Sequence, residues 1–200
     1  MRLVLDWDGT VTERDTLHMT IERFGDLAVF HAMEEQIGRA LTLNEVIGVE
    51  METISAPFEE VLAWLLEVVR VRPGLAELVA EHDPLIVSAG FRELIEPILE
   101  REGIEAPVVA NRLDPAPDGW RAIFLERPAC PVCGEPCKRM ALAGAGPYVF
   151  VGDGVSDRCA SLAAARVFAR DGLARWLGGQ GVPYEPFGDL HDVRRALPPS

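Results

Sequence analysis

The sequence has few basic residues: 19 Lys and Arg stand against 32 Asp and Glu, which gives a formal net charge of −13. Proteins that bind nucleic acid through its phosphates use Lys and Arg to neutralise them. The acidic composition therefore argues against nucleic acid as a partner.

Long hydrophobic runs are also missing, and no apolar stretch reaches the length of a membrane span. The chain begins with Arg2 and a short apolar run instead of a signal peptide. We therefore expect a cytoplasmic protein with no membrane partner, either a monomer or a homodimer. The 200 residues, 48% hydrophobic and 26% charged, are typical of one globular domain or of one core with a smaller insertion.

Cysteine is scarce as well, since four cysteines in 200 residues do not make a disulfide scaffold. Three of them, Cys130, Cys133 and Cys137, lie in one short segment whose C-P-x-C-G start resembles a zinc knuckle. Structural zinc sites normally have four ligands, however, and no second pair of cysteines is evident. Zinc at these three residues therefore stays open beside an ordinary cysteine-bearing loop, and Cys159 is interpreted as a buried helix cysteine that could lie near Lys138.

A buried strand that ends in charge opens the chain. The apolar run Leu3-Val4-Leu5 is followed by Asp6-Trp7-Asp8-Gly9-Thr10. Alternate residues of a strand share a face, so Asp6 and Asp8 can reach one small centre while Trp7 points away. Two adjacent carboxylates repel each other, and a bound Mg²⁺ ion is the simplest way to neutralise them. A solvated turn at Asp8-Gly9 is the rival interpretation of this stretch taken alone.

Helical periodicity fills the region after the first strand. Between residues 15 and 71 apolar residues recur at helical spacing, with short breaks at which Asp26, Asn44 and Ser55 are plausible caps. This pattern predicts a small helical bundle inserted into the chain. The predicted domains are a helical cap at 14–72 and a catalytic core at 1–13 and 73–200.

The rest of the chain alternates short apolar strands with helices. Strands are predicted at 85–87, 108–111, 147–151 and 167–169, and one arm of a hairpin at 120–125. Strands and helices that alternate with short connections predict an α/β fold, a Rossmann-like parallel sheet with helices on both faces.

Polar residues follow several of these strands. Ser88 follows the second predicted strand, Asp153 and Asp157 follow the strand at 147–151, and Lys138 lies in the segment before that strand. Each of them alone could be a helix cap, a turn residue or a solvated side chain. The carboxyl ends of parallel strands meet at one edge of a sheet, so the joint pattern predicts one shared site with the two carboxylates of the first strand.

Taken in order, these motifs resemble the haloacid dehalogenase-like superfamily of magnesium-dependent phosphatases. The family's pattern is DxDGT, a strand-terminal Ser or Thr, a Lys, and a GDxxxD-like acidic motif, and this chain matches it from Asp6 to Asp157. A helical insertion after the first motif is what the family calls a type 1 cap. Because the chain is acidic, a phosphate ester would need a local positive site made of metal, lysine and backbone amides.

The resemblance implies a role for each matched residue. Asp6 would attack phosphorus and form an aspartyl-phosphate, and Asp8 would act as acid and base. Magnesium would be held by Asp6, the backbone carbonyl of Asp8, and Asp153. Asp157 would orient Lys138. The phosphoryl oxygens would be bound by Ser88, Lys138 and the amides around Gly9, Thr10, Ala89 and Gly90.

The substrate is a small phosphate ester in this interpretation. The cap position and the run 87–91 resemble phosphoserine phosphatases, but the substrate-reading Glu of that enzyme corresponds here to Asp15. The run 6–16, the Cys-x-x-x-Cys-Lys segment that ends at Lys138, and residues 168–171 and 186–189 look more like methionine-salvage phosphatases. Those enzymes act on 2-hydroxy-3-keto-5-methylthiopentenyl-1-phosphate, which is the expected substrate, with Asp15 among the residues that bind it.

Two alternatives stay open. Within the class, the chain could be a phosphoserine phosphatase or another small-phosphoester phosphatase or phosphotransferase. From a different class, it could be a non-catalytic phospholigand- or zinc-binding module that kept the fold. The intact set of Asp6, Asp8, Lys138 and Asp153 argues against the second alternative.

Overall fold

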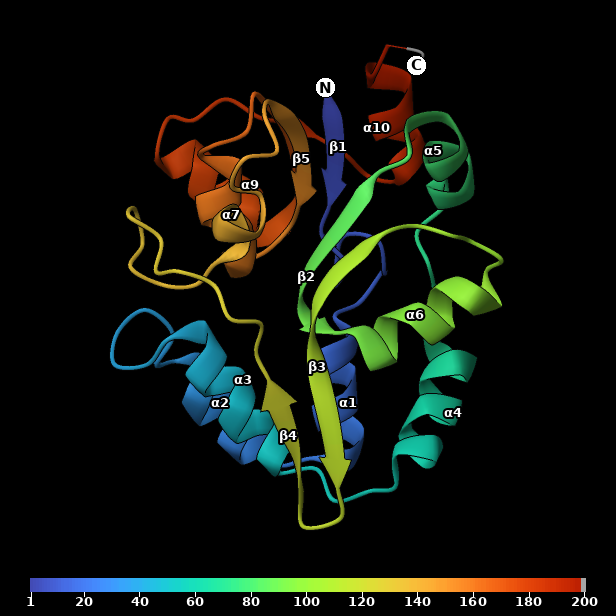
Figure 1. Ribbon diagram of the computed structural model, residues 1–200, viewed down its shortest axis with the longest axis vertical. Coiled ribbons are helices and arrows are strands. Elements are labelled where there is room, and N and C mark those ends of the chain that lie inside the picture. Colours follow the sequence, from blue (N-terminus) through green and yellow to red (C-terminus); the bar gives the residue numbers. More distant parts are fainter. Residues whose placement is uncertain (199–200) are drawn as a thin grey trace.

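The computed structural model describes residues 1–198, and these residues form a seven-stranded sheet in the order β4-β3-β2-β1-β5-β6-β7 (Figure 1). All neighbouring strands in this order pair in parallel except β4 and β3, which are antiparallel. The predicted α/β fold is thus confirmed. The strands are β1 (Arg2–Leu5), β2 (Leu85–Phe91), β3 (Val108–Ala116), β4 (Gly119–Ile123), β5 (Tyr148–Gly152), β6 (Arg166–Ala169) and β7 (Glu185–Pro186).

Strand β1 lies in the middle of the sheet because its side chains are apolar on both faces. Leu3 and Leu5 belong to a buried cluster with residues of three helices on one face, while Val4 packs with Leu142 and Ala160 on the other. The first face is covered by α5 (Leu75–His82), α6 (Arg92–Arg101) and α10 (Leu190–Ala196), and the second by α7 (Lys138–Ala141), α8 (Arg158–Ser161) and α9 (Asp171–Gly179).

Four helices stand between β1 and α5 along the chain. Their inward side chains, among them Ile21, Ile47 and Leu65, belong to the same buried cluster as Leu3 and Leu5. The helical layer and the sheet therefore share one continuous hydrophobic core, and the domain bounds given above stay a prediction. The four helices are α1 (Thr16–Phe24), α2 (Leu27–Glu34), α3 (Leu43–Glu52) and α4 (Phe58–Val68).

Of the three predicted helix caps, only Asp26 is confirmed, since its carboxylate accepts backbone amides at the start of α2. The cap predicted at Asn44 is wrong, because α3 begins earlier. Its cap is Thr42, which forms a capping box in which the Thr42 and Glu45 side chains each accept the other residue's backbone amide. The cap predicted at Ser55 is also wrong, since α4 begins without a side-chain cap.

The hairpin of β3 and β4 extends beyond the parallel sheet and lies against α3 (Figure 1). The predicted hairpin arm is confirmed, but β3 is longer than the predicted strand at 108–111, because its second half pairs with β4. Trp120 on β4 is fully buried, and its indole Nε1 donates to the carbonyl of Ala56 at 3.0 Å. A Cβ on Gly119 would lie 2.6 Å from the Glu52 carbonyl oxygen, so the hairpin backbone approaches α3 closely.

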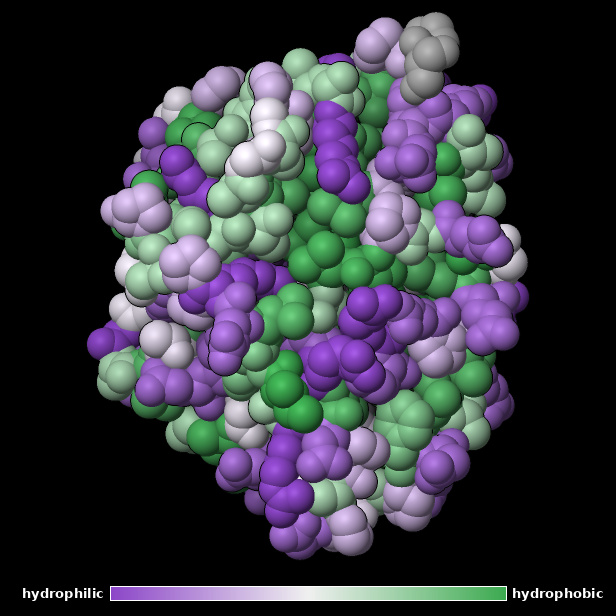
Figure 2. Space-filling model, in the orientation of Figure 1, coloured by the Kyte–Doolittle hydropathy of each residue, from purple (hydrophilic) through white to green (hydrophobic). Residues whose placement is uncertain are grey.

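The visible surface is mixed in character. Figure 2 shows hydrophilic residues over much of this face, with hydrophobic residues gathered in a band over β2. Within residues 1–198, no helix combines the length and the hydrophobicity that a membrane span requires. The expected cytoplasmic location and the monomeric or homodimeric state stay predictions.

We expect Trp120→Ala to lower the free energy of unfolding by about 3–5 kcal/mol, because it leaves a large cavity and removes the indole hydrogen bond. Urea unfolding followed by circular dichroism measures this. The matched control is Arg121→Ala, at the next, exposed position, which should change stability by less than about 0.5 kcal/mol. Equal stabilities for the two variants would contradict the packing described here.

Candidate active site

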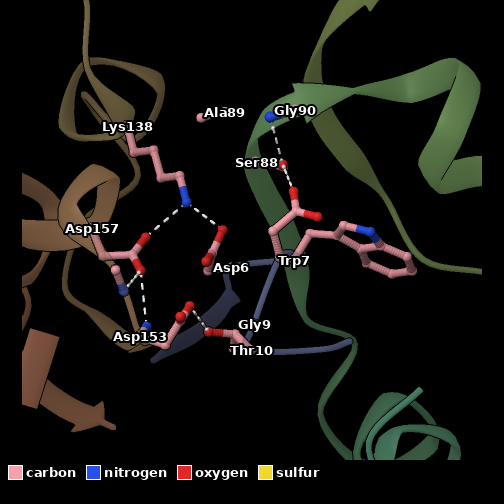
Figure 3. Close-up of polar contacts among 12 residues, drawn as sticks. Asp6, Trp7, Gly9, Thr10, Ser88, Ala89, Gly90, Lys138, Asp153 and Asp157 are labelled. Atoms are coloured by element: carbon pink, nitrogen blue, oxygen red, sulfur yellow. Dashed lines mark hydrogen bonds and ion pairs between the residues drawn. The ribbon is translucent and has the colours of Figure 1, made fainter. Parts of the chain in front are cut away.

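The predicted site residues meet at the carboxyl edge of three neighbouring strands. Asp6 follows β1, Ser88 lies in β2, and Asp153 follows β5, and these strands are adjacent in the order β2-β1-β5. Figure 3 shows Asp6, Asp153 and Ser88 around one small space, while the indole of Trp7 points away from it. The topology thus brings together residues that are far apart in the sequence.

Lys138 is buried between two carboxylates (Figure 3). It is the first residue of α7, and its Nζ donates to Asp6 Oδ1 and, at 2.7 Å, to Asp157 Oδ1. Burial alone would lower the pKa of the ammonium, but the charges of Asp157 and Asp6 outweigh it and raise the pKa above its ordinary value. Lys138 therefore stays positively charged at the centre of the site.

Asp157 uses both carboxylate oxygens within the chain. While Oδ1 accepts from Lys138, Oδ2 accepts the backbone amides of Asp153 at 2.9 Å and Gly154 at 3.0 Å. A Cβ on Gly152 would lie 2.6 Å from this second oxygen, so a glycine is needed there. Asp157 therefore positions both the lysine and the turn that carries Asp153.

Negative charge is concentrated beside the lysine. Carboxylate oxygens of Asp6, Asp153 and Asp157 lie within 4.8 Å of one another, and Thr10 Oγ1 donates to Asp153 Oδ1 at 2.9 Å. Burial and the charge of Asp157 raise the pKa of Asp6 well above its usual range and that of Asp153 to about 6. Gly9 adopts a φ of +74°, and a Cβ there would clash with the Asp153 carboxylate.

Asp8 is bound by a different set of partners from Asp6. Its Oδ1 accepts the amide of Thr16 at 2.8 Å and the Thr16 hydroxyl, and its Oδ2 lies 3.5 Å from the Ser88 hydroxyl. Burial, with the charge of Asp15 second, raises the pKa of Asp8 to about 7. The two carboxylates of the first motif thus sit in distinct environments.

The backbone amides expected to bind phosphate are partly engaged already. The amide of Gly9 donates to Thr12 Oγ1, that of Thr10 to the Trp7 carbonyl, and that of Gly90 to Ser88 Oγ. Anion binding by these amides would require those bonds to open. The roles of Gly9, Thr10, Ala89 and Gly90 stay predictions.

A cavity of about 210 Å³ separates this edge of the sheet from the helical layer. Asp15 lies on its wall and caps α1, accepting the amide of His18 at 2.9 Å. The other lining residues are Asp6, Asp8, Leu17, His18, Phe30, Glu34, Leu43, Ile47, Glu50, Ala89, Gly90, Asp153, Gly154, Val155 and Ser156.

Glu50 is a cavity residue that the sequence pattern did not reveal. Only 3% of it is exposed, and its Oε1 has no hydrogen-bond partner within residues 1–198. Burial, followed by the charges of Glu34 and Asp15, raises its pKa to about 8. In the sequence it stands in an amphipathic helix among ordinary surface glutamates, and only the packing of α3 over the site buries it.

Arg72 is a second residue missed by the sequence pattern. Its buried guanidinium donates at 3.0 Å to the carbonyls of both Thr10 and Gly9, and at 3.3 Å to that of Thr12. It therefore holds the loop after β1 through three backbone carbonyls. Its place directly before Pro73-Gly74, at the exit from the helical insertion, is the available sequence signal.

The cysteine segment lies next to Lys138. The three predicted thiols of Cys130, Cys133 and Cys137 come together, and Cys159 on α8 joins them, with all four sulfurs within 4.8 Å of one another. Cys159 is a buried helix residue, as expected, but the sequence did not group it with the other three because it belongs to a helix beyond β5.

A comparison with protein families shows which family this chain belongs to. A model of haloacid dehalogenase-like hydrolases matches residues 3–161. The chain belongs to this family. The family membership expected from the DxDGT, Ser, Lys and acidic motifs is therefore confirmed, while the role of each motif residue stays a prediction.

Curated relatives of this haloacid dehalogenase-like hydrolase are phosphatases. It is 29% identical over 208 residues to the 2-hydroxy-3-keto-5-methylthiopentenyl-1-phosphate phosphatase of Microcystis aeruginosa (strain NIES-843 / IAM M-2473), covering 96% of this chain and 95% of the relative. The enzyme of the same name from Brevibacillus brevis (strain 47 / JCM 6285 / NBRC 100599) is 27% identical, with 98% and 94% covered.

Solved structures with the same fold include phosphoserine phosphatases. A substrate-bound phosphoserine phosphatase superimposes with a TM-score of 0.73 at 17% identity, and a phospho-aspartyl intermediate analogue of phosphoserine phosphatase with 0.70 at 17%; each match covers 98% of both chains. These neighbours show that the fold is shared, and the family with its curated relatives identifies the chain as a phosphatase.

We expect Glu50→Gln to raise the melting temperature by several degrees at about pH 8, and to change it little at about pH 4. A folded-state pKa of about 8, above the ordinary 4.5, means that the stability contribution of Glu50 is present at low pH and lost as pH rises. Glutamine removes this loss, so the difference between variant and wild type should grow with pH.

Thermal unfolding across this pH range measures the effect, and Glu52→Gln on the exposed side of the same helix is the matched control. Glu34, Asp15 and His18 line the same cavity and remain unchanged in both variants. A pH-independent difference for Glu50→Gln would contradict a buried, proton-retaining carboxyl.

Proposed function

We propose that the chain is a magnesium-dependent phosphomonoester hydrolase that acts through an aspartyl-phosphate on a small metabolite. The observation that carries this proposal is Asp6, which is buried at the end of the central strand, paired with Lys138, and open to the cavity. A carboxylate held there by a permanent positive charge is a suitable nucleophile for phosphorus.

The acidic cluster fits Mg²⁺, which prefers oxygen ligands. Asp6 and Asp153 would hold the ion together with the backbone carbonyl of Asp8. Asp157 is a poorer ligand, because its two oxygens are engaged by Lys138 and by backbone amides. When bound, the ion supplies charge neutralisation for the phosphoryl group and for the nucleophile.

The chain's own residues divide the reaction between them. An oxygen of Asp6 forms a bond to phosphorus as the bond from phosphorus to the alcohol oxygen breaks, and Asp8 gives its proton to that oxygen. In the second step Asp8 takes a proton from water as the water oxygen bonds to phosphorus, and the bond from phosphorus to Asp6 breaks, which releases phosphate and restores the Asp6 carboxylate. Asp8 suits this work because Thr16 and Ser88 bind it and Lys138 does not. Lys138 and Ser88, with the Ala89 amide, bind the phosphoryl oxygens.

The first substrate candidate is 2-hydroxy-3-keto-5-methylthiopentenyl-1-phosphate. It is supported by relatives of that name at 21–29% identity that match at least 96% of this chain. The cavity also offers apolar side chains beside the acidic site, namely Phe30, Leu43 and Ile47. A methylthio-bearing chain could pack against these groups.

A second candidate is a phosphate ester that carries an amine. It is favoured by Glu50, whose buried and unpartnered oxygen lines the same cavity as Glu34 and Asp15. An ammonium group of the substrate would pair with Glu50 and neutralise this wall. Phosphoserine carries a primary ammonium group, and phosphocholine carries a quaternary ammonium group that would pair through its charge alone.

We expect the wild type to release phosphate from a phosphomonoester in the presence of Mg²⁺, and Asp6→Asn to lower kcat by at least about a thousandfold, because the nucleophile is lost. Phosphate release assayed with and without Mg²⁺ measures both. The matched control is Asp118→Asn in an exposed turn, which should keep full activity. A folded wild type inactive on a broad ester panel, or an Asp6→Asn enzyme of equal activity, would refute the proposal.

We expect the highest kcat/KM with 2-hydroxy-3-keto-5-methylthiopentenyl-1-phosphate when that ester is compared with phosphoserine and phosphocholine. Glu50→Gln should leave its KM nearly unchanged, since that substrate has no ammonium group. A higher kcat/KM for an amine-bearing ester, with a KM raised about tenfold in Glu50→Gln through the lost charged pair, would support the second candidate instead.

A further inference from the structure

The catalytic residues leave one chemically active cluster unexplained, which is the group of four cysteines. The sulfurs of Cys130, Cys133, Cys137 and Cys159 all lie within 4.8 Å of one another. A tetrahedral zinc site with Zn–S bonds of about 2.3 Å places its sulfurs roughly 3.8 Å apart. Cys130 and Cys159 are already 3.5 Å apart, so the four thiols need only small movements to reach that geometry.

The loop that carries three of the thiols has the backbone of a metal-binding turn. The amides of Val132 and Cys133 hydrogen-bond to the Cys130 sulfur, and the amide of Gly134 donates to the Cys130 carbonyl at 2.8 Å. Gly134 has a φ of +78°, which lets the chain reverse directly after the second cysteine. Backbone amides that point at a sulfur stabilise a thiolate, the form that binds metal.

The position of the loop argues for a stabilising ion. Residues 124–137 contain no helix or strand, and a connection of that length needs some other means of holding one conformation. Cys130 and Cys159 are buried, and all four cysteines are free thiols. A metal that joins the loop to α8 would supply the constraint that secondary structure does not.

We propose that Cys130, Cys133, Cys137 and Cys159 bind a structural zinc ion. Four thiolate ligands fill the tetrahedral coordination sphere of zinc, which is typical of structural sites and leaves no open position for catalysis. The cysteine site and the carboxylates that would hold Mg²⁺ share no residue. They favour different metals, because soft sulfur ligands select zinc and hard oxygen ligands select magnesium.

The site also connects to the catalytic residues through the chain. Cys137 directly precedes Lys138, and Cys159 follows Asp157 by one intervening residue. Zinc would therefore join the start of α7, which carries Lys138, to α8, which follows Asp157. This link would hold Lys138 and Asp157 at their 2.7 Å contact. In this arrangement the cysteines are positioning residues and do not touch the substrate.

The test is metal analysis of the full chain purified without added metal or chelator. We expect about one zinc per chain by elemental analysis, with zinc and protein eluting together through gel filtration. The measurement does not depend on phosphatase activity, so its result stands whether or not the proposed reaction is confirmed. Less than about a tenth of an equivalent of zinc, or iron in its place, would overturn the proposal.

Three variants separate zinc from a disulfide explanation. Cys133 is exposed, so its substitution leaves the buried core intact. Cys133→Ser should lose most of the zinc and melt at a lower temperature, whereas Cys133→His should keep it, because imidazole binds zinc but cannot form a disulfide. The control Val132→Ala, at an exposed neighbour, should keep full zinc content.

Two results would contradict zinc binding by this cluster. One is a Cys133→His protein as poor in zinc as Cys133→Ser while Val132→Ala behaves like the wild type. The other is mass spectrometry of the untreated protein that finds Cys130 and Cys159 joined as a disulfide.

Discussion

The buried ammonium group of Lys138 is the interaction on which the rest of the site depends. Asp6, Asp153 and Asp157 place three carboxylates within a few ångströms of one another, and Asp6 and Asp157 are buried while Asp153 is half-buried. Burying a charge without a partner is costly, and the lysine offsets part of that cost through Asp6 and Asp157. The remaining negative charge is the reason why a divalent cation fits beside it. Lys138 and the proposed Mg²⁺ ion would thus neutralise the same acidic cluster together.

This constraint explains how neighbouring elements are placed. The short helix α7 presents Lys138 from one side, and the turn after β5 presents Asp153 with its amide held by Asp157. Glycines stand where the carboxylates approach the backbone most closely, at Gly9 and Gly152. Arg72 then ties the loop after β1 through its carbonyl oxygens. The electrostatics of a few buried groups therefore determine the backbone around them.

The helical layer adds a second level of organisation. It shares a continuous hydrophobic core with the sheet, and the β3–β4 hairpin covers it through Trp120. Because α2 and α3 pack over the catalytic edge, they set the chemical character of the cavity, with apolar side chains and acidic ones side by side. In the proposed function, this wall is the surface that meets the part of the substrate beyond its phosphate.

Local pattern by itself determined the α/β class, the helical insertion after the first strand, and the four motifs at strand ends, since apolar periodicity and residue order are properties of the linear chain. Most of the candidate site was visible in the same way, because Asp6, Ser88 and Asp153 stand at or near the carboxyl ends of strands, and Lys138 lies in the segment before one of those strands. Only the tertiary structure decided which distant residues meet. It turned Glu50 of α3 into the cavity, turned Arg72 toward the first loop, and added Cys159 to three cysteines of a loop. Side-chain neighbours across strands and helices depend on packing that sequence spacing does not record.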